Sequence, residues 1–268
     1  MPSFARTPQK APQPGAFLLC RLRYRCVPLA FLFVVTLFLA PLAVAEGVTV
    51  RQVLDGDSVV LTDQRQVRLV GINAPELGKD GMPDEPLAVA ARDRLRGLIE
   101  GKALRLVLEE EQRDRYGRWL AHLVQPDGAS VEEILLKEGL AAAVAIPPNI
   151  AQITRLQAAE AQARKARRGL WGHAYFTPVS VELLIPAHTG FRFVRGTVTH
   201  VGRSAKFVYL DMGPQFALRI AHTDWQKYFR GRAEDWRSTQ IVARGWISAQ
   251  NGRLHMSIGH PAMLERLP

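Results

Sequence analysis

The chain has 268 residues, so it is long enough for one large domain or for two small domains that each bury a core. Its formal net charge is +10, and it contains two cysteines, Cys20 and Cys26. Both lie before residue 46, so residues 46–268 contain no disulfide, no cysteine nucleophile and no thiolate metal site.

Residues 1–45 have the pattern of an export signal. A head with five basic and no acidic residues precedes the apolar run VPLAFLFVVTLFLAPLAVA at 27–45, which ends in a small-x-small pattern. We expect this signal peptide to be cleaved near Ala45–Glu46, leaving a secreted or periplasmic chain with no stable membrane association. The alternative is a retained N-terminal membrane anchor, because 19 apolar residues can just span a bilayer.

Residues 46–176 are expected to form the first domain. Alternating apolar residues predict strands at 48–54, 58–63 and 65–72, then a helix at 85–101 and strands at 103–111 and 118–125. Two more helices are predicted at 131–139 and near 150–168. The domain is therefore β-rich α+β with five strands and three helices. A five-stranded barrel of the OB-fold type fits this order. An ordinary mixed sheet is the alternative, and the pattern alone does not decide between the two.

Residues 177–190 are expected to be a linker, and residues 191–268 a second, small OB-like β domain with five strand candidates. Charge differs between the two parts: 46–186 holds 18 basic and 20 acidic residues (−2), whereas 187–268 holds 12 basic and 5 acidic residues (+7). Basic residues in the second part alternate with aromatic ones, which is typical of single-strand binding. The alternative is that the aromatic side chains form the core and the charges a solvated surface.

Acidic and basic residues of the first domain fit the needs of phosphodiester hydrolysis. That reaction needs a cation to neutralise phosphoryl oxygens, a base for the water and fixed positive charge on the phosphate. Asp57 can hold the cation, Glu76 can be the base, and Arg68 with Arg118 can bind the phosphate through their forked guanidinium groups. The segment Asp55-Gly56-Asp57 by itself is more typical of a hairpin turn in which glycine supplies a positive φ.

Five segments together carry a family resemblance: VLDGDSVVL (53–61), RLVGINAPE (68–76), DRYGRWLAHL (114–123), EEILLKEGLA (132–141) and GLWG (169–172). In this order and spacing they resemble the staphylococcal nuclease-like (thermonuclease) family over about residues 48–172. The resemblance implies an OB-fold barrel and a Ca²⁺-dependent nuclease that hydrolyses DNA, RNA or both. We expect the mature chain to be a monomer.

The resemblance also implies roles for individual residues. It assigns a metal site to the Asp57 carboxylate, the Asn73 side chain and the backbone carbonyl of Ala74, with Asp55 supporting that site. It assigns catalysis to Arg68, Glu76 and Arg118. It assigns substrate binding to Arg115 and Tyr116.

Two departures from the family pattern favour a second hypothesis. Asn73 stands where the family usually has an aspartate, so the cation site loses a negative charge while keeping an oxygen ligand. The segment AAAVAIPPN at 141–149 lacks the tyrosines that some members place against a base. The alternatives are a catalytically weakened OB-fold protein that binds nucleic acid and a structural module of the cell envelope.

The seven histidines show no spacing typical of zinc ligands. His122 lies in a predicted strand between apolar neighbours, so its side chain is expected to face solvent or a polar groove.

Overall fold

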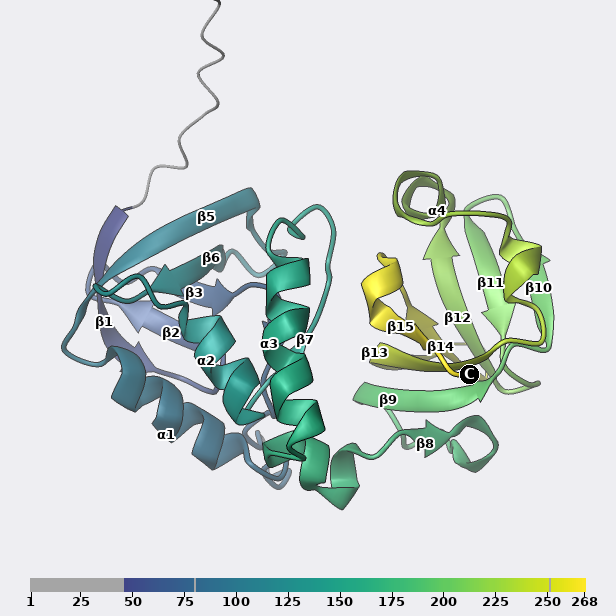
Figure 1. Ribbon diagram of the computed structural model, residues 1–268, viewed down its shortest axis with the longest axis horizontal. Helices are drawn as coiled ribbons and strands as arrows, with labels where there is room; N and C mark the ends of the chain where they lie inside the picture. Colours follow the sequence, from purple (N-terminus) through teal and green to yellow (C-terminus); the bar gives the residue numbers. More distant parts are fainter. Residues whose placement is uncertain (1–45, 80, 251) are drawn as a thin grey trace, which may run out of the picture. The chain divides into compact units, whose positions relative to one another are not determined.

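The computed structural model describes residues 46–79, 81–250 and 252–268 (Figure 1). The expected export signal at 1–45, its cleavage position and both cysteines lie outside the described residues. Within the described ranges, no helix has the length and apolar character needed to cross a membrane.

The first part of the described chain is a closed barrel. Its strands, in sheet order, are β1 (Glu46–Val53), β2 (Ser58–Leu61), β3 (Gln66–Leu69), β6 (Trp119–Val124) and β5 (Ala103–Arg113). β3 and β6 pair in parallel, and the other neighbours pair antiparallel. Alternation directs Val59, Leu61, Val67 and Leu69 into the barrel core. The predicted five-stranded barrel is therefore confirmed, and the mixed-sheet alternative is wrong.

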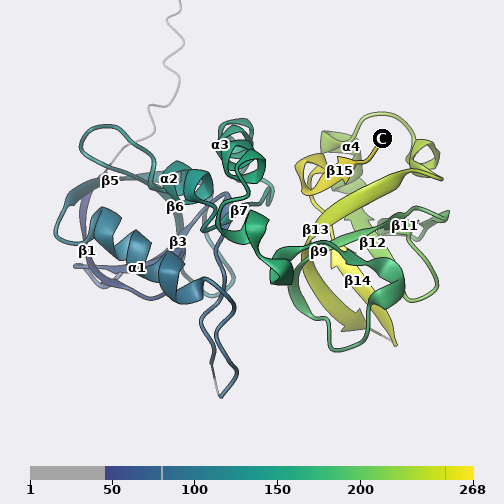
Figure 2. The same ribbon diagram turned by 60° about the horizontal axis from the view of Figure 1, so that its bottom comes forward.

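The three predicted helices are α1 (Ala88–Ile99), α2 (Val131–Glu138) and α3 (Ile153–Lys165). α2 begins where the sequence predicts, because the Ser130 hydroxyl accepts a hydrogen bond from the backbone N–H of Glu133 at 3.2 Å. α1 and α2 pack against barrel strands, and α2 also packs against α3 (Figures 1 and 2).

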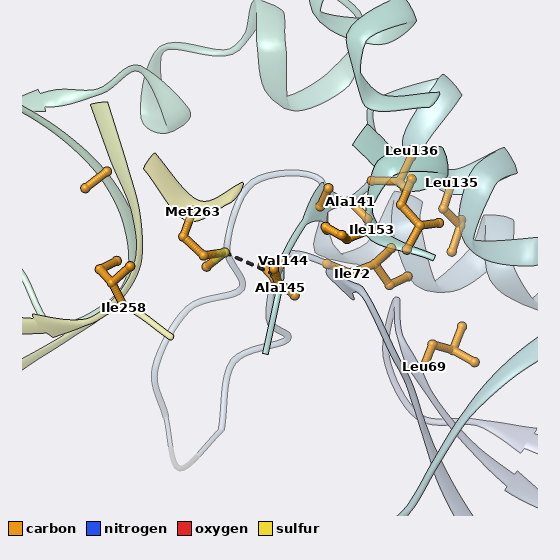
Figure 3. Close-up of a cluster of buried hydrophobic side chains, with 14 of the residues drawn as sticks. Leu69, Ile72, Leu135, Leu136, Ala141, Val144, Ala145, Ile153, Ile258 and Met263 are labelled. Atoms are coloured by element: carbon orange, nitrogen blue, oxygen red, sulfur yellow. Dashed lines mark hydrogen bonds between the residues drawn. The ribbon is translucent and has the colours of Figure 1, made fainter. Parts of the chain in front are cut away.

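A two-stranded ribbon connects the helices to the barrel. β4 (Ile72–Asn73) pairs antiparallel with β7 (Ala142–Ala143), and its register sets Asn73 opposite Ala142. Ile72 packs in the same buried cluster as Leu135 and Ile153 (Figure 3). The ribbon therefore ties the segment that carries Asn73 to the helical core. A strand at 142–143 was not predicted from the sequence.

The second part is the expected small β domain, built on one eight-stranded sheet with the order β10-β11-β12-β14-β13-β9-β8 and with β15 paired to β13 (Figure 1). Its strands are β8 (Val179–Ser180), β9 (Gly190–Thr197), β10 (His200–Arg203), β11 (Phe207–Asp211), β12 (Phe216–Ala221), β13 (Gln240–Gln250), β14 (Arg253–Ser257) and β15 (Leu264–Arg266). Helix α4 (His222–Tyr228) follows β12 directly. The predicted first strand of this domain, 191–202, is interrupted after Thr197 and forms β9 and β10.

A buried ion pair joins β13 to α3. The Arg244 Nη1 atom lies 2.7 Å from Glu160 Oε1, and both side chains are buried. Glu160 also accepts a hydrogen bond from the backbone N–H of Ala143 in β7. Because a buried carboxylate that loses its cation is strongly destabilising, removing the C-terminal domain would perturb the barrel domain as well. Tests of that domain therefore need point substitutions.

His122 contradicts the sequence expectation, since its side chain is only 2% exposed. It points away from the barrel core, as alternation requires, but the acidic side chains of two elements enclose it. Its Nε2 lies 2.9 Å from Glu109 Oε1 in β5, and its Nδ1 lies 3.5 Å from Glu132 Oε1 in α2. Burial lowers the pKa of His122, but hydrogen bonds to the two carboxylates outweigh burial and raise that pKa to about 9.

We expect the stability of the protein to fall at high pH because of His122. Its folded pKa of about 9 lies above the ordinary histidine value of 6.5, so its contribution is fully present below pH 6.5 and is lost as pH rises through 9. The shift corresponds to roughly 3 kcal/mol at most. Denaturant unfolding should show that His122→Gln lowers the free energy of unfolding strongly at pH 6 and less above pH 9.

The exposed His200 offers a matched control, since it also lies beside a carboxylate, at 2.9 Å from Asp211. His200→Gln should change the free energy of unfolding by less than about 1 kcal/mol. A loss in His122→Gln that stays constant between pH 6 and pH 10 would contradict the assignment.

Candidate active site

The acidic turn between β1 and β2 is held by its own side chains and by the barrel. The Asp55 carboxylate accepts a hydrogen bond from the backbone N–H of Asp57 at 3.0 Å, and Asp57 C=O accepts one from Leu69 N–H at 2.8 Å. Gly56 is required for space: a Cβ there would lie 2.5 Å from the Cβ of Ala74 and 2.8 Å from that of Ala91. Its φ is not positive, so the expected reason for glycine in this turn is wrong.

Asp57 is the centre of the site, and its side chain is almost completely buried, with the residue 3% exposed. Its Oδ2 lies 2.9 Å from Arg68 Nη1 and accepts a hydrogen bond from Ala74 N–H at 2.8 Å. Its Oδ1 accepts a hydrogen bond from the Ser58 hydroxyl at 3.1 Å. Burial nevertheless raises the pKa of Asp57 to about 7; Arg68 opposes the rise, and Asp55 and Glu76 add to it. Burial therefore disfavours the charged form of Asp57 although Arg68 lies beside it.

Arg68 reaches from β3 to Asn73 as well as to Asp57. Its Nη2 donates to Asn73 Oδ1 at 3.2 Å, and its Nη1 donates to the backbone carbonyl of Leu69 at 2.9 Å. The Asn73 Nδ2 atom donates to the Ala74 carbonyl at 3.3 Å. Asp57, Arg68, Asn73 and Ala74 thus form one continuous hydrogen-bonded group, which contains the three expected metal ligands and one of the three expected catalytic residues.

Glu76 lies beyond Pro75 at the edge of this group, and its side chain reaches the surface. Its backbone is fixed by Glu85, because Glu76 N–H donates to Glu85 Oε2 at 3.0 Å and Glu76 C=O accepts from Glu85 N–H at 2.9 Å. Partial desolvation by the surrounding side chains, and then the Asp55 carboxylate, raise the pKa of Glu76, while Arg68 opposes the rise. Glu76 and Arg68 therefore act on each other electrostatically.

Glu85 was missed in the sequence because nothing in its position distinguishes it from a charged residue at the start of a helix. Its carboxylate accepts hydrogen bonds from Glu76 N–H and from the Tyr175 hydroxyl, the latter at 3.0 Å. It also lies 3.3 Å from Arg192 Nη1. The loop that carries Glu76 is thereby attached to residues more than 90 positions away in the chain.

Arg118 belongs to a second group, in the turn between β5 and β6. Asp114 fixes this turn: its Oδ2 accepts from Arg118 Nε at 2.7 Å, and its Oδ1 accepts from the backbone N–H groups of Tyr116 and Arg118. Gly117 has a φ of +82°, which the turn requires. Within the described residues, the two Nη groups of Arg118 have no hydrogen-bond partner. They remain available to a phosphate.

Arg115 and Tyr116 complete the second group. The Tyr116 side chain is 70% exposed, and its hydroxyl accepts a hydrogen bond from Arg115 Nη2 at 2.7 Å. The Arg115 and Arg118 guanidinium carbons lie 4.8 Å and 5.7 Å from the centroid of the Tyr116 ring. The turn therefore presents two cations and one aromatic ring at the surface, as a substrate-binding role requires.

The register of the barrel relates the two groups. β3 and β6 pair so that Arg68 lies opposite Leu120, and Arg118 precedes Leu120 by two residues. Alternation sends all three side chains to the outer side of the barrel, because Val67 and Ala121 face its core. No direct contact joins Arg118 to Arg68 or Asp57 among the described residues. The sequence-predicted site is thus one connected group with a second group on the neighbouring strand.

Comparison with known proteins assigns the barrel domain to a family. The family model described as "Staphylococcal nuclease homologue" matches residues 66–173. A protein named "Thermonuclease" from Staphylococcus hyicus is 32% identical over 125 residues, which cover 46% of this chain and 73% of that protein. The "Thermonuclease" of Staphylococcus intermedius is 33% identical over 129 residues, with 47% and 76% covered. An "Uncharacterized endonuclease" of Escherichia coli O157:H7 is 35% identical over 126 residues, with 46% and 75% covered.

The family match includes the strands and turns that hold Arg68, Asn73, Glu76 and Arg118, and it ends at residue 173, before the C-terminal β domain. The chain therefore belongs to the staphylococcal nuclease family, which places it among the nucleases, a class of hydrolases.

Proposed function

We propose that this protein is a Ca²⁺-dependent nuclease that hydrolyses phosphodiester bonds of DNA, RNA or both by attack of water. The observation that carries the proposal is the connected group around the buried Asp57 carboxylate, with Glu76 at its edge. The thermonuclease and endonuclease names of the relatives support the same chemistry.

The residues at this site fit a hard divalent cation. Asp57 offers a carboxylate oxygen, Asn73 an amide oxygen and Ala74 a backbone carbonyl oxygen, and such oxygen ligands are those that Ca²⁺ prefers. Burial is the main cause of the raised pKa values of Asp57 and Glu76, and neighbouring carboxylates add to it while Arg68 opposes it. A bound cation would stabilise the charged forms of these carboxylates and neutralise the negative charge of the scissile phosphate. Asp55 would add to the attraction without being a ligand.

The side chains have distinct tasks in this proposal. Glu76 takes a proton from the attacking water, the new bond forms between the water oxygen and phosphorus, the bond to the leaving sugar oxygen breaks, and that oxygen takes up a proton from solvent water to become a hydroxyl. Arg118 binds phosphate oxygens with its free Nη groups while Asp114 fixes its Nε. Among the described residues, Arg68 has N–H donors without a partner on Nε and Nη2, so it can donate to a phosphate oxygen while it keeps its contacts to Asp57 and Asn73.

One observation favours the second candidate, a catalytically weakened OB-fold protein that binds nucleic acid. Asn73 carries no charge, and its Oδ1 already accepts a hydrogen bond from Arg68. A cation would therefore meet fewer charged ligands than a site with two aspartates would provide. Hydrolysis of single-stranded DNA in Ca²⁺ compared with chelator separates the two candidates.

We also propose that residues 1–45 direct export and that the mature chain is a secreted or periplasmic monomer. The basic head, apolar run and small-x-small end of that segment support export. A mature chain whose mass still includes residues 1–45 would contradict it and favour the membrane anchor.

Glu76→Gln is expected to slow hydrolysis of single-stranded DNA by about 10²- to 10⁴-fold, because it removes the base but keeps the shape of the side chain. In the unmodified protein, the rate should fall as pH drops through the pKa of Glu76, which is raised above its ordinary value. Initial rates at saturating Ca²⁺ across pH 4 to 8 measure both effects.

Glu110 provides the matched control, since it is an exposed glutamate in β5 outside the site. Glu110→Gln should hydrolyse DNA at the unmodified rate. The base assignment fails if Glu76→Gln retains that rate, or if both variants lose activity equally.

Asn73→Asp is expected to lower the calcium concentration needed for half-maximal hydrolysis by about tenfold, because a charged ligand replaces a neutral one. The unmodified protein should need Ca²⁺ on the order of millimolar. Asp55→Asn should shift the requirement in the opposite direction, since it removes negative charge beside Asp57. An unchanged requirement in Asn73→Asp, with calcium binding confirmed by calorimetry, would show that Asn73 is not a ligand.

A further inference from the structure

The sheet of the C-terminal domain has an outward face on which aromatic and basic side chains gather. Its central strands β11, β12 and β14 are neighbours in the sheet. We define the β11–β12–β14 face by five side chains, all of them partly exposed: Phe207, Tyr209, Arg219, Arg253 and His255. It lies outside the segment matched by the nuclease family, which ends at residue 173.

Alternation separates this face from the core. Val208, Leu218 and Met256 point to the opposite side of the same three strands and are fully buried. The aromatic side chains of the β11–β12–β14 face are therefore not needed to fill that core. This corrects the alternative that the sequence left open for Phe207 and Tyr209.

The strand register brings the five side chains into one patch. Tyr209 lies opposite Arg219, and Arg219 lies opposite Ser257. The guanidinium carbon of Arg219 is 4.8 Å from the centroid of the Phe207 ring. The centroid of the Tyr209 ring lies 6.2 Å from that of Phe207 and 6.4 Å from that of His255. The four side chains thus form a continuous row of planar groups across the sheet.

Small residues border this row. Ala221 lies opposite Phe207, and Ala217 lies opposite both Asp211 and His255. Because alanine side chains are short, the aromatic rings and the guanidinium group extend further from the sheet than these neighbours do. A planar ligand can therefore approach the rings from the solvent side.

The charge on the face is positive and only partly compensated. Arg219 donates hydrogen bonds to Gln250 Oε1 at 3.4 Å and Ser257 Oγ at 3.0 Å, so its partners in the described part of the chain are neutral. Arg253 is paired with Asp211 at 2.6 Å. Lys206 is exposed at the start of β11. These charges belong to the segment 187–268, whose formal charge is +7.

Several polar atoms of the face lack partners. Among the described residues, Arg219 Nε, Arg253 Nε and His255 Nδ1 are covered and make no hydrogen bond. Burial, followed by the charges of Arg253 and Arg219, lowers the pKa of His255, whereas Asp211 opposes the shift. Both observations describe a local excess of donors and positive charge that a bound anion would relieve.

We propose that the β11–β12–β14 face binds single-stranded nucleic acid, with bases against Phe207 and Tyr209 and backbone phosphates at Arg219 and Arg253. Every base has a planar face that can stack on an aromatic ring, whereas a duplex conceals those faces in its own stack. The excess positive charge matches the phosphate backbone. The face is a binding site separate from the barrel, and it can exist whether or not the barrel hydrolyses its substrate.

The test measures binding of a fluorescein-labelled oligothymidylate to the full chain by fluorescence anisotropy, in chelator so that no hydrolysis occurs. The double substitution Phe207→Leu with Tyr209→Leu keeps apolar side chains but removes the rings. It should weaken single-strand binding at least about tenfold, with little effect on duplex binding. Arg219→Gln should weaken single-strand binding and reduce the slope of log K against log salt by about 0.7.

Arg230→Gln is the matched control, because Arg230 is an exposed arginine of the same domain outside the face. It removes one positive charge, as Arg219→Gln does. It should change neither the affinity for the single strand nor the loss of affinity that the ring substitutions cause. Unfolding curves identify any variant that has lost its fold, and the separate Phe207→Leu and Tyr209→Leu variants then replace the double one. Unchanged binding in the ring variants, an equal loss in Arg230→Gln or equal affinity for duplex and single strand would overturn the proposal. Hydrolysis is assayed separately with Ca²⁺. A failure of the proposed single-strand binding can therefore be distinguished from a failure of the proposed nuclease function.

Discussion

The buried carboxylate of Asp57 is the constraint on which the site depends. This side chain joins the turn before β2 to Arg68 in β3 and to the backbone of Ala74 after β4. Gly56 lets this turn approach Ala74 and Ala91 closely, and burial keeps water away from the charge. Burial disfavours the charged forms of Asp57 and Glu76 despite Arg68, and the neighbouring carboxylates add to this effect, so the folded barrel maintains a place where added positive charge is favourable.

The strands and helices of the barrel could be predicted from their apolar patterns, whereas its closure was implied by the family resemblance. β3 alternates, and Ser130 begins α2 as a cap. The β4–β7 pair could not be predicted, because two-residue strands are too short to show a period. The burial of His122 could not be predicted either. Alternation shows on which side of the strand its side chain lies, but only the packing of α2 decides whether that side is exposed to solvent.

The sequence indicated which residues form the site, but it did not show the contacts among them. Motif order brought Asp57, Arg68 and Asn73 together correctly. Nothing in the sequence shows that Arg68 occupies the Asn73 oxygen, that Asp114 holds Arg118, or that Glu85 fixes the backbone of Glu76. These contacts depend on which loops meet in space. In the C-terminal domain, composition indicated a polyanion partner, and only the strand register assigned Phe207 and Tyr209 to one face.

The decisive measurement for the cation site is the pKa of Asp57. Carboxyl-carbon NMR of the full chain, with the signal assigned by its loss in Asp57→Asn, gives the pKa of this group in chelator and in excess Ca²⁺. We expect a pKa of about 7 in chelator and a marked decrease when calcium is added. A pKa near the ordinary value of 3.8 that calcium does not change would contradict a cation site at Asp57.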